Sequence, residues 1–399
     1  MSKTTLPLQR IASVDAYRGL MMLYMAFESW RLAEPMIKSM PESPFGQWLY
    51  WQLSHVTWRG GGAWDMIQPS FTFLVGVAMV FSLQKRSEKG EDFWAKFRHV
   101  LWRSLILILI GVFLRSAWSK QTYWTFEDTL SQIGLGYPFL FLLSYKSIRF
   151  QWYALIGILI AYWLLFVLYP LPPAGFDYTT VGFPVEGKPT VLPTGFAAHW
   201  SLNTNAAWAF DTWFLNLFPR ESPFLFNEGG YSTLSFIPTL GTQILGLIAG
   251  QKLLGQGTPT EKIKYFIMAG VIGIAAALLL DITGICPNVK RIWTPSWVLY
   301  SGGICSLLLA FFYYFVDVRQ HAKFVFPLTI VGMNSIFFYC ISDSHIRGYI
   351  VDSLKIHLGQ GFFTGVGEAW IPLAEGCATL LVFWLITYWL YRNRIFIRV

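Results

Sequence analysis

Apolar residues in this chain come in blocks of about twenty, separated by shorter polar segments, and this is the length that a helix needs to cross the hydrocarbon core of a bilayer. Each block therefore predicts one membrane-spanning helix. The blocks cover residues 12–34, 64–84, 99–118, 129–145, 150–170, 233–254, 262–281, 293–316, 325–345 and 369–391. The pattern predicts an all-α fold, a polytopic membrane bundle of about ten transmembrane helices.

Two long polar segments interrupt the blocks, at residues 35–63 and 171–232. The sequence contains no internal repeat that would indicate an array of smaller units. Residues 1–399 are therefore expected to form a single transmembrane domain, with both polar segments on its outer face.

Charge and composition agree with a membrane protein. Hydrophobic residues make up 54% of the chain and charged residues 13%, about half the charged fraction of soluble proteins. The net charge of +8 does not indicate nucleic-acid binding, because the basic residues are spread through short loops. They concentrate at the N-terminus and in residues 85–98, 146–149, 252–264, 317–324 and 392–399. Short basic loops stay in the cytoplasm, so both termini are expected there.

The four cysteines provide no evidence for a metal site. Cys286, Cys305, Cys340 and Cys377 are isolated, and none has metal-ligand or CxxC spacing. We expect them to be small packing residues, and we predict no metal.

The first block, SVDAYRGLMMLYMAFESWRL, carries four charged residues. A charge inside a span costs about 2.5–3.5 kcal/mol on insertion scales, so it needs a partner or a function. Asp15 and Arg18 fall on one helical face and can form an ion pair, and Glu28 and Arg31 repeat that spacing. Glu28 is also a candidate for lining a polar cavity near the outer surface.

The segment LSHVTWRGGGAWDMIQPSF (Leu53 to Phe71) places a histidine and an aspartate on either side of three glycines. A Gly-rich segment at membrane depth is tolerated only where it is buried in protein or lines a cavity. His55 and Asp65 are then candidates for a pair in which the carboxylate orients the imidazole and the second ring nitrogen faces substrate. The alternative is an ordinary interfacial histidine.

Three further polar islands lie at or within the apolar blocks. NEGGYSTLSFIP contains Glu228, PNVKRIWTPSW contains Lys290, Thr294 and Ser296, and VGMNSIFFYCISDS contains Asn334. Asn334 would be unsatisfied in lipid, so it is expected to face the bundle interior. Each island, taken alone, also fits a structural role.

These islands, in this order, resemble the transmembrane acetyltransferases typified by the lysosomal heparan-α-glucosaminide N-acetyltransferase, with bacterial NagX-like and DUF5009 relatives. The matching pieces are SVDAYRGL, HVTWRGGGAWDMIQPSFTFLVGVAM, NEGGYSTL, KRIWTPSWV, GMNSIFFY and YRNRIFIRV. The second is the most specific, since the family shows His-x-x-Trp-x-Gly followed by Asp and Pro at these separations. The resemblance implies a multi-pass protein of the bacterial inner membrane.

The resemblance implies transfer of an acetyl group from cytoplasmic acetyl-CoA to the amine of glucosamine, or of a glycan that ends in glucosamine, on the outer side. The active-site histidine and aspartate of the family fall on His55 and Asp65. Where the family has an active-site asparagine, this chain has Ser29, beside Glu28. A family arginine is replaced by Gln132.

The expected site follows from this chemistry. His55 is the general base for the acceptor amine, or alternatively the nucleophile of an acetyl-histidine intermediate. Residues proposed for the oxyanion or the acceptor are Glu28, Ser29, Asn334 and Glu228. Residues assigned to the cofactor are Arg18, Lys290, Thr294 and Ser296, with Lys264 and the loop 85–98 as further candidates for phosphate contacts.

Other functions stay open at this point. A proton-coupled amino-sugar transporter would use Glu28, His55 and Asp65 as a relay. An O-acyltransferase acting on an envelope polysaccharide would use a hydroxyl acceptor, and a non-catalytic scaffold would leave the polar residues unexplained. The expected partners are a sugar acceptor and membrane lipid, and a homodimer is left open.

Overall fold

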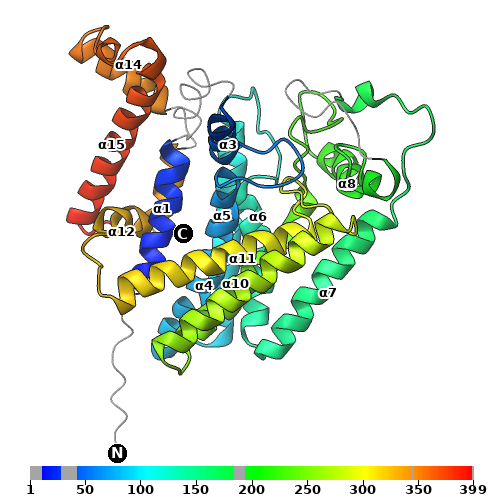
Figure 1. The fold of residues 1–399 in the computed structure, drawn as a ribbon, viewed down its shortest axis with the longest axis horizontal. Coiled ribbons are helices and arrows are strands. Elements are labelled where there is room, and N and C mark those ends of the chain that lie inside the picture. Colours follow the sequence, from blue (N-terminus) through cyan, green and yellow to red (C-terminus); the bar gives the residue numbers. More distant parts are fainter. Residues whose placement is uncertain (1–10, 28–42, 184–193, 343–345, 398–399) are drawn as a thin grey trace, which may run out of the picture.

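The computed structural model describes residues 11–27, 43–183, 194–342 and 346–397, and the regular elements within these ranges are helical (Figure 1). The α-helices are α1 (Ala12–Phe27), α3 (Pro44–Leu53), α4 (Ile67–Glu88), α5 (Phe93–Ser116), α6 (Thr129–Ser144), α7 (Ile148–Val167), α8 (Ala206–Phe214), α9 (Phe236–Leu254), α10 (Pro259–Ile282), α11 (Pro295–Phe312), α12 (Phe326–Met333), α13 (Ser335–Ser342), α14 (Ile346–Leu358) and α15 (Ile371–Arg392). The predicted all-α fold is confirmed.

Seven helices among the described residues are long and apolar enough to cross a membrane. With their short flanking turns they span Trp64–Glu88, Phe93–Ser116, Ile148–Val167, Thr233–Leu254, Pro259–Ile282, Pro295–Val318 and Glu368–Arg392. Helix α6 is apolar but shorter, with 16 residues. These helices indicate a membrane protein, and the count of ten spans stays a prediction.

One predicted span differs from the helices observed, and another is described only in part. The block at 325–345 contains two helices of eight residues each, α12 and α13, which meet at Asn334. The Asn334 side chain provides a reason for the break, because its amide donates to Ile395 O and its oxygen accepts from Ile397 N. The block at 12–34 begins as α1, and its second part lies outside the described residues.

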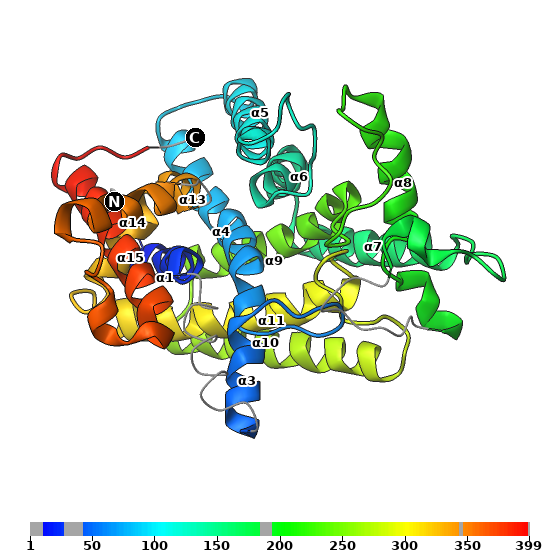
Figure 2. The same cartoon turned by 90° about the horizontal axis from the view of Figure 1, so that it is seen from above.

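The helices pack in pairs, with α4 along α9, α10 along α11, α1 along α12 and α5 along α6. Small residues permit the closest approach: a Cβ on Gly76 of α4 would lie 2.1 Å from Gln243 O, and one on Gly246 of α9 would lie 1.9 Å from Phe73 O. Backbone contact of this kind is typical of helices packed in membranes. Figure 2 shows α1 and α13–α15 on one side, α7 and α8 on the other, and α4, α9, α10 and α11 between them.

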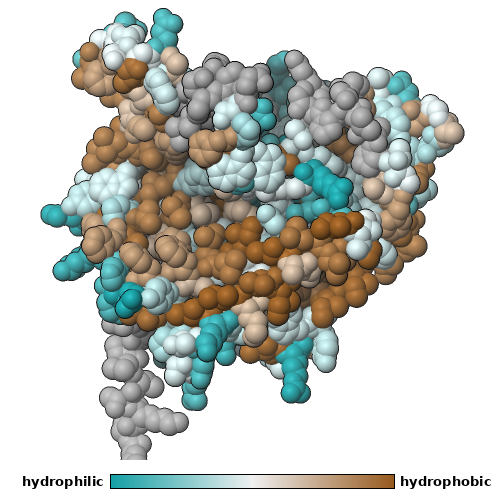
Figure 3. Space-filling view, viewed as in Figure 1, coloured by the Kyte–Doolittle hydropathy of each residue, from teal (hydrophilic) through white to brown (hydrophobic). Residues whose placement is uncertain are grey.

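Apolar side chains form a band across the face drawn in Figure 3, over α10 and α11, with polar side chains at both ends. Exposed apolar residues on α7 and α10 include Ile156, Ile160, Val271, Ile272 and Leu279. Such a surface fits contact with lipid tails. The two predicted outer segments contain helices α3 and α8, which lie at the same end of the molecule (Figure 1).

Candidate functional site

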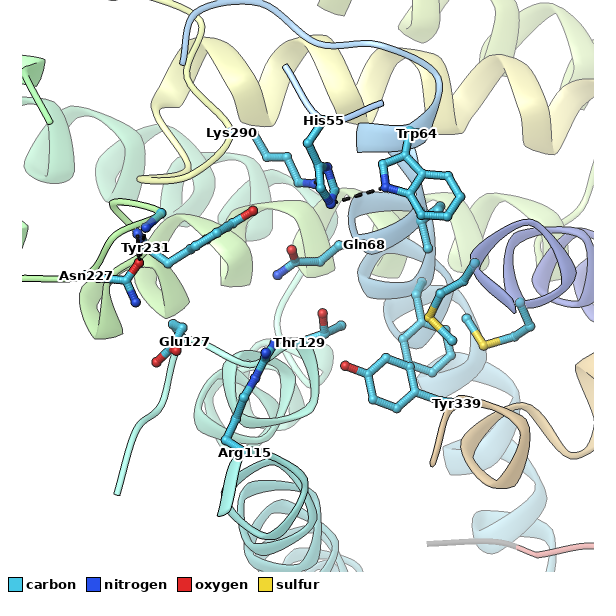
Figure 4. Close-up of a pocket in the computed structure, with 15 residues that line it drawn as sticks. His55, Trp64, Gln68, Arg115, Glu127, Thr129, Asn227, Tyr231, Lys290 and Tyr339 are labelled. Atoms are coloured by element: carbon cyan, nitrogen blue, oxygen red, sulfur yellow. Dashed lines mark hydrogen bonds between the residues drawn. The ribbon is translucent and has the colours of Figure 1, made fainter. Parts of the chain in front are cut away.

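A cavity of about 460 Å³ lies at the end of the molecule that carries α3 and α8 (Figure 4). It is lined by residues from α1, the 53–66 segment, α4, the start of α6, the Asn227–Tyr231 loop and α13, together with Arg115 and Lys290. These are Met22, Met25, His55, Trp64, Ile67, Gln68, Phe71, Arg115, Glu127, Thr129, Asn227, Gly229, Tyr231, Lys290 and Tyr339. His55 is therefore open to a cavity and is not directed toward lipid.

The structure brings His55 and Asp65 together. His55 Nδ1 lies 2.8 Å from Asp65 Oδ1, and Trp64 Nε1 donates to His55 Nε2 over 3.2 Å. An indole N–H can only donate, so Nε2 must accept and the ring proton resides on Nδ1. The imidazole is thus held as the tautomer whose acceptor nitrogen is Nε2, and the lone pair of Nε2 accepts the Trp64 N–H.

Asp65 is buried and fully used as an acceptor. Its side chain is 2% exposed. Oδ1 also accepts from Lys290 Nζ at 2.9 Å, and Oδ2 accepts from the backbone N–H groups of Val56 and Gly62 at 3.2 Å each. Four donors on one carboxylate fix its position and its charge. The carboxylate is therefore suited to orient the imidazole and not to exchange protons itself.

Lys290 is the third member of this cluster, since its Nζ lies 3.3 Å from His55 Nδ1 as well as close to Asp65. Partial burial of the ring and the positive charge of Lys290 lower the pKa of His55 from its ordinary value of 6.5, against the opposing effect of Asp65. An imidazole with a lowered pKa is neutral at pH 7. It can accept a proton or attack a carbonyl.

The three glycines explain how a ten-residue separation becomes a contact. Gly60 has φ +102°, a conformation that favours glycine. A Cβ on Gly61 would lie 2.3 Å from the Trp297 ring, and one on Gly62 would lie 2.4 Å from Trp51 O. Gly60 N also donates to Asn288 O at 2.7 Å. This contact joins the glycine loop to the loop that carries Lys290.

The opposite wall of the cavity carries a carboxyl and a guanidinium group, and the sequence analysis missed it. Glu127 and Thr129 lie across the cavity from His55 and Lys290, together with Arg115 (Figure 4). Burial raises the pKa of the Glu127 carboxyl, and the charge of Arg115 opposes this shift. The sequence feature that could have indicated this wall is the pair of acidic residues, Glu127 and Asp128, immediately before α6.

Asp128, next to Glu127, anchors this wall. Its Oδ1 accepts from Leu130 N at the start of α6, while Oδ2 lies 3.4 Å from Arg115 Nη2 and accepts from Tyr339 at 3.1 Å. The carboxylate thus ties α5, α6 and α13 together beside the cavity.

A second cavity, of about 440 Å³, is strongly basic. Arg18, Phe71, Val75, Ala78, Ser82, Lys85, Arg86, Lys89, Glu91, His99, Arg103, Met333, Ser335, Ile336 and Ile397 line it. Phe71 lines both cavities. Lys85, Arg86 and Lys89 come from the predicted cytoplasmic loop 85–98, and Arg18 and Arg103 come from the predicted spans 12–34 and 99–118. Five guanidinium or ammonium groups around one hollow fit the phosphates of a nucleotide.

The residues assigned to the cofactor are not brought together. Arg18 lines the basic cavity and lies 3.8 Å from Asp15, as expected for that pair. Lys290 lies instead beside His55. Thr294 and Ser296 are fully buried and use their hydroxyls within the loop before α11, where Ser296 donates to Pro287 O and Thr294 accepts from Val289 N.

The residues assigned to the oxyanion or acceptor are also dispersed. Asn334 is buried as expected, but its amide binds the C-terminal segment and does not line the cavity with His55. Glu228 lines a neighbouring groove, next to Asn227 and Gly229 of the cavity wall. Glu28 and Ser29 lie outside the described residues. Gln132 is buried and donates to Ser232 O and Thr233 O, which fixes the Asn227–Tyr231 loop from behind.

Among the described residues, no group of three or more His, Cys, Asp or Glu side chains is arranged to hold a metal ion.

Comparison with known proteins identifies two relatives along almost the whole chain. The sequence is 24% identical to the heparan-alpha-glucosaminide N-acetyltransferase of Homo sapiens over 433 aligned positions, and 22% identical to that of Mus musculus over 432. Both alignments cover 97% of this chain, which spans 59% and 60% of the length of these curated relatives. No family model matches the chain, so the narrower DUF5009 assignment stays a prediction. The chain is thus a homologue of heparan-alpha-glucosaminide N-acetyltransferase, and this similarity supports its membership of that family.

Proposed function

We propose that this protein is a membrane-embedded acetyltransferase that moves an acetyl group from acetyl-CoA to the amine of glucosamine or of a glucosamine-terminated glycan. The observation that carries the proposal is the imidazole of His55, held by Asp65 in the wall of one cavity, together with a basic cavity that shares Phe71 with it. The similarity to N-acetyltransferases supports the reaction type.

In this proposal the acceptor displaces the Trp64 N–H from His55 Nε2, and Nε2 then removes a proton from the acceptor ammonium or amine. The amine nitrogen forms a bond to the thioester carbonyl carbon, the carbon–sulfur bond breaks, and thiolate leaves. In the alternative route Nε2 itself attacks the thioester carbonyl and the carbon–sulfur bond breaks, so that thiolate leaves and an acetyl-imidazole forms. The amine then attacks this acetyl group, which releases the His55 imidazole and a proton from the amine. Asp65 stabilises the imidazolium formed in the direct route and keeps the proton of the neutral ring on Nδ1, so that Nε2 is the basic nitrogen.

Donors for the oxyanion are proposed from the cavity wall, in place of Asn334. Figure 4 shows the amide of Gln68 within the cavity and the hydroxyl of Tyr231 directed toward Lys290 and His55. Both groups can donate to a negative oxygen that develops next to Nε2.

The basic cavity fits the nucleotide end of acetyl-CoA, because Arg18, Lys85, Arg86 and Lys89 offer charged donors for its phosphates. The pantetheine arm would then pass Phe71, which borders both cavities. By the distribution of Lys and Arg, this end faces the cytoplasm and His55 faces the outer side of the membrane.

The wall that carries Glu127 and Arg115 is the proposed site of the acceptor amine. A sugar amine is an ammonium ion before it reacts, and the Glu127 carboxyl lies across the cavity from His55 with oxygens that can accept from this ammonium. We propose that Glu127 attracts the ammonium and positions it, while the neutral imidazole accepts its proton.

The test uses purified protein, acetyl-CoA with a labelled acetyl group, and glucosamine. His55→Ala is expected to lower the rate of labelled product by about 10²- to 10⁴-fold, the usual contribution of a general base. His357→Ala is the matched control, because His357 is exposed on α14 and lines neither cavity. Wild-type turnover in His55→Ala would contradict both roles of His55.

The same reagents without the acceptor distinguish the route in which His55 is the base from the route in which it is the nucleophile, by measuring label bound to the protein. The nucleophile route predicts label on the wild-type protein and none on His55→Ala. The base route predicts no protein-bound label in either.

A further inference from the structure

A third hollow, of about 730 Å³, adjoins the cavity that contains His55. It lies between the segment Trp118–Trp124, which follows α5, and the segment Pro219–Gly229, which follows α8. Asn227 and Gly229 line both the hollow and the cavity. We call this hollow the outer groove, and a ligand that reaches His55 can extend into it without leaving the protein surface.

The outer groove is held in a fixed shape. Arg220 Nη1 donates to Trp124 O at 2.7 Å, and the guanidinium stacks 4.8 Å from the centre of the Tyr123 ring. Lys120 N donates to Glu221 Oε1 at 2.9 Å. These contacts join the two walls through groups of the protein itself. A groove formed in advance costs a ligand less ordering entropy than a loop that must close.

The walls combine exposed aromatic rings with backbone and side-chain polar groups. Trp118 is 73% exposed and Tyr123 is 39% exposed. Flat aromatic faces next to hydrogen-bonding groups match a sugar ring, which has an apolar C–H face and a hydroxyl edge. The volume is also in the range of small-molecule sites, about 300–1,000 Å³.

The charges of the outer groove balance. Its two cationic side chains are Lys120 and Arg220, and its two anionic side chains are Glu221 and Glu228. A site for a polyanion would carry excess positive charge. The groove therefore fits an uncharged sugar chain better than a sulfated or uronate-rich one.

On the basis of the proposed function, we propose that the acceptor is an oligosaccharide whose terminal glucosamine lies beside His55 and whose following, uncharged sugar units occupy the outer groove. Trp118 then packs against one of these units, and Asn227 marks the boundary between the terminal sugar and the rest of the chain.

The experiment compares kcat/KM for three acceptors with the full chain in detergent and saturating acetyl-CoA. They are glucosamine, a tetrasaccharide with terminal glucosamine followed by three N-acetylglucosamine units, and a sulfated, uronate-containing tetrasaccharide with the same terminal sugar. The neutral tetrasaccharide is expected to exceed glucosamine by about tenfold, equivalent to about 1.4 kcal/mol, and to exceed the sulfated chain. A neutral tetrasaccharide no better than glucosamine, or a preferred sulfated chain, would overturn the proposal.

Substitutions of Trp118 test whether the preference for the tetrasaccharide arises in the outer groove. Trp118→Ala should bring the ratio of tetrasaccharide to glucosamine kcat/KM close to one, and Trp118→Phe should retain most of it. Trp213→Ala is the matched control, because Trp213 is 61% exposed on α8 and lines none of the three hollows. An unchanged ratio in Trp118→Ala would overturn the assignment of the groove.

A binding measurement keeps this inference separate from the reaction. Tryptophan fluorescence of the His55→Ala variant is titrated with the neutral tetrasaccharide, and the titration is repeated after adding Trp118→Ala. Saturable binding that weakens without Trp118 supports the groove even if wild-type protein acetylates none of the acceptors, which would defeat the proposed function alone. The absence of binding would overturn the groove.

Discussion

The cavity that contains His55 and the basic cavity are nearly equal in volume, about 460 and 440 Å³, and Phe71 lines both. They differ in whether their charged groups are buried or exposed. In the first, Asp65 is buried and accepts from His55, Lys290 and two backbone N–H groups. In the second, Lys85 and Lys89 are exposed at the surface. A buried charge in a fixed position, such as that of Asp65, determines where the proton of one neighbouring group lies. Several exposed charges, such as those of Lys85 and Lys89, together attract an anion. Activity should therefore depend on the exact position of the charged group in the first cavity. In the second cavity, the affinity for an anion should depend on the number of positive charges.

The largest effect is expected from Asp65→Asn. An amide cannot hold the proton of His55 on Nδ1 as the carboxylate does, so Nε2 is no longer fixed as the base. We expect kcat to fall by about 10²- to 10⁴-fold, with little change in KM for acetyl-CoA. Steady-state kinetics checks this, and an unchanged kcat would show that the pair is only structural.

The next largest effect is expected from Gly61→Ala. Its Cβ would lie 2.3 Å from the Trp297 ring, which is fully buried and cannot move away. We expect a loss of about 1–3 kcal/mol in stability, measured as a lower Tm, together with lower activity. Gly157→Ala on α7 is the control, since a Cβ there meets nothing within 4 Å. Equal Tm values for the two variants would refute the close packing of the glycine loop.

Lys290→Met tests the electrostatics of the same cavity. His55 must be neutral to react, so kcat/KM should fall in acid, through a pKa below 6.5. The charge of Lys290 lowers the pKa of His55, so its removal should move the acid limb of the profile to higher pH. Lys264→Met is the control, because Lys264 lines neither cavity. A limb that stays in place or moves to lower pH would contradict the assignment.

The smallest effect is expected in the basic cavity. Replacing Lys85 or Lys89 with Gln should raise KM for acetyl-CoA only about 1.4- to fivefold, because an exposed charge contributes about 0.2–1 kcal/mol. The double variant should add the two effects, and both should weaken with rising salt. Lys264→Gln should leave KM unchanged. A fall of KM, or a large loss of kcat from one lysine, would contradict this contrast.

The regular helices were largely predictable from the sequence. The apolar blocks at 129–145 and 233–254 match helices within one or two residues, because length and hydropathy determine a span. The break at Asn334 was not predictable from hydropathy, since it depends on hydrogen bonds to residues about sixty positions later.

The site was predictable only where its residues are close in sequence. His55 and Asp65 are ten residues apart, and the glycines between them indicated a special loop. Lys290 is 225 positions from Asp65, and Glu127 belongs to a different helix junction, so no local pattern connects either to His55. Such contacts depend on how α4, α6 and the loop before α11 pack together.

A structure with bound acetyl-CoA tests the central claim most directly. The account predicts phosphates among Arg18, Lys85 and Lys89, an arm that passes Phe71, and a thioester carbonyl beside His55 Nε2. Phosphates bound at the opposite end, or a thioester that stays on the basic side of Phe71, would contradict it.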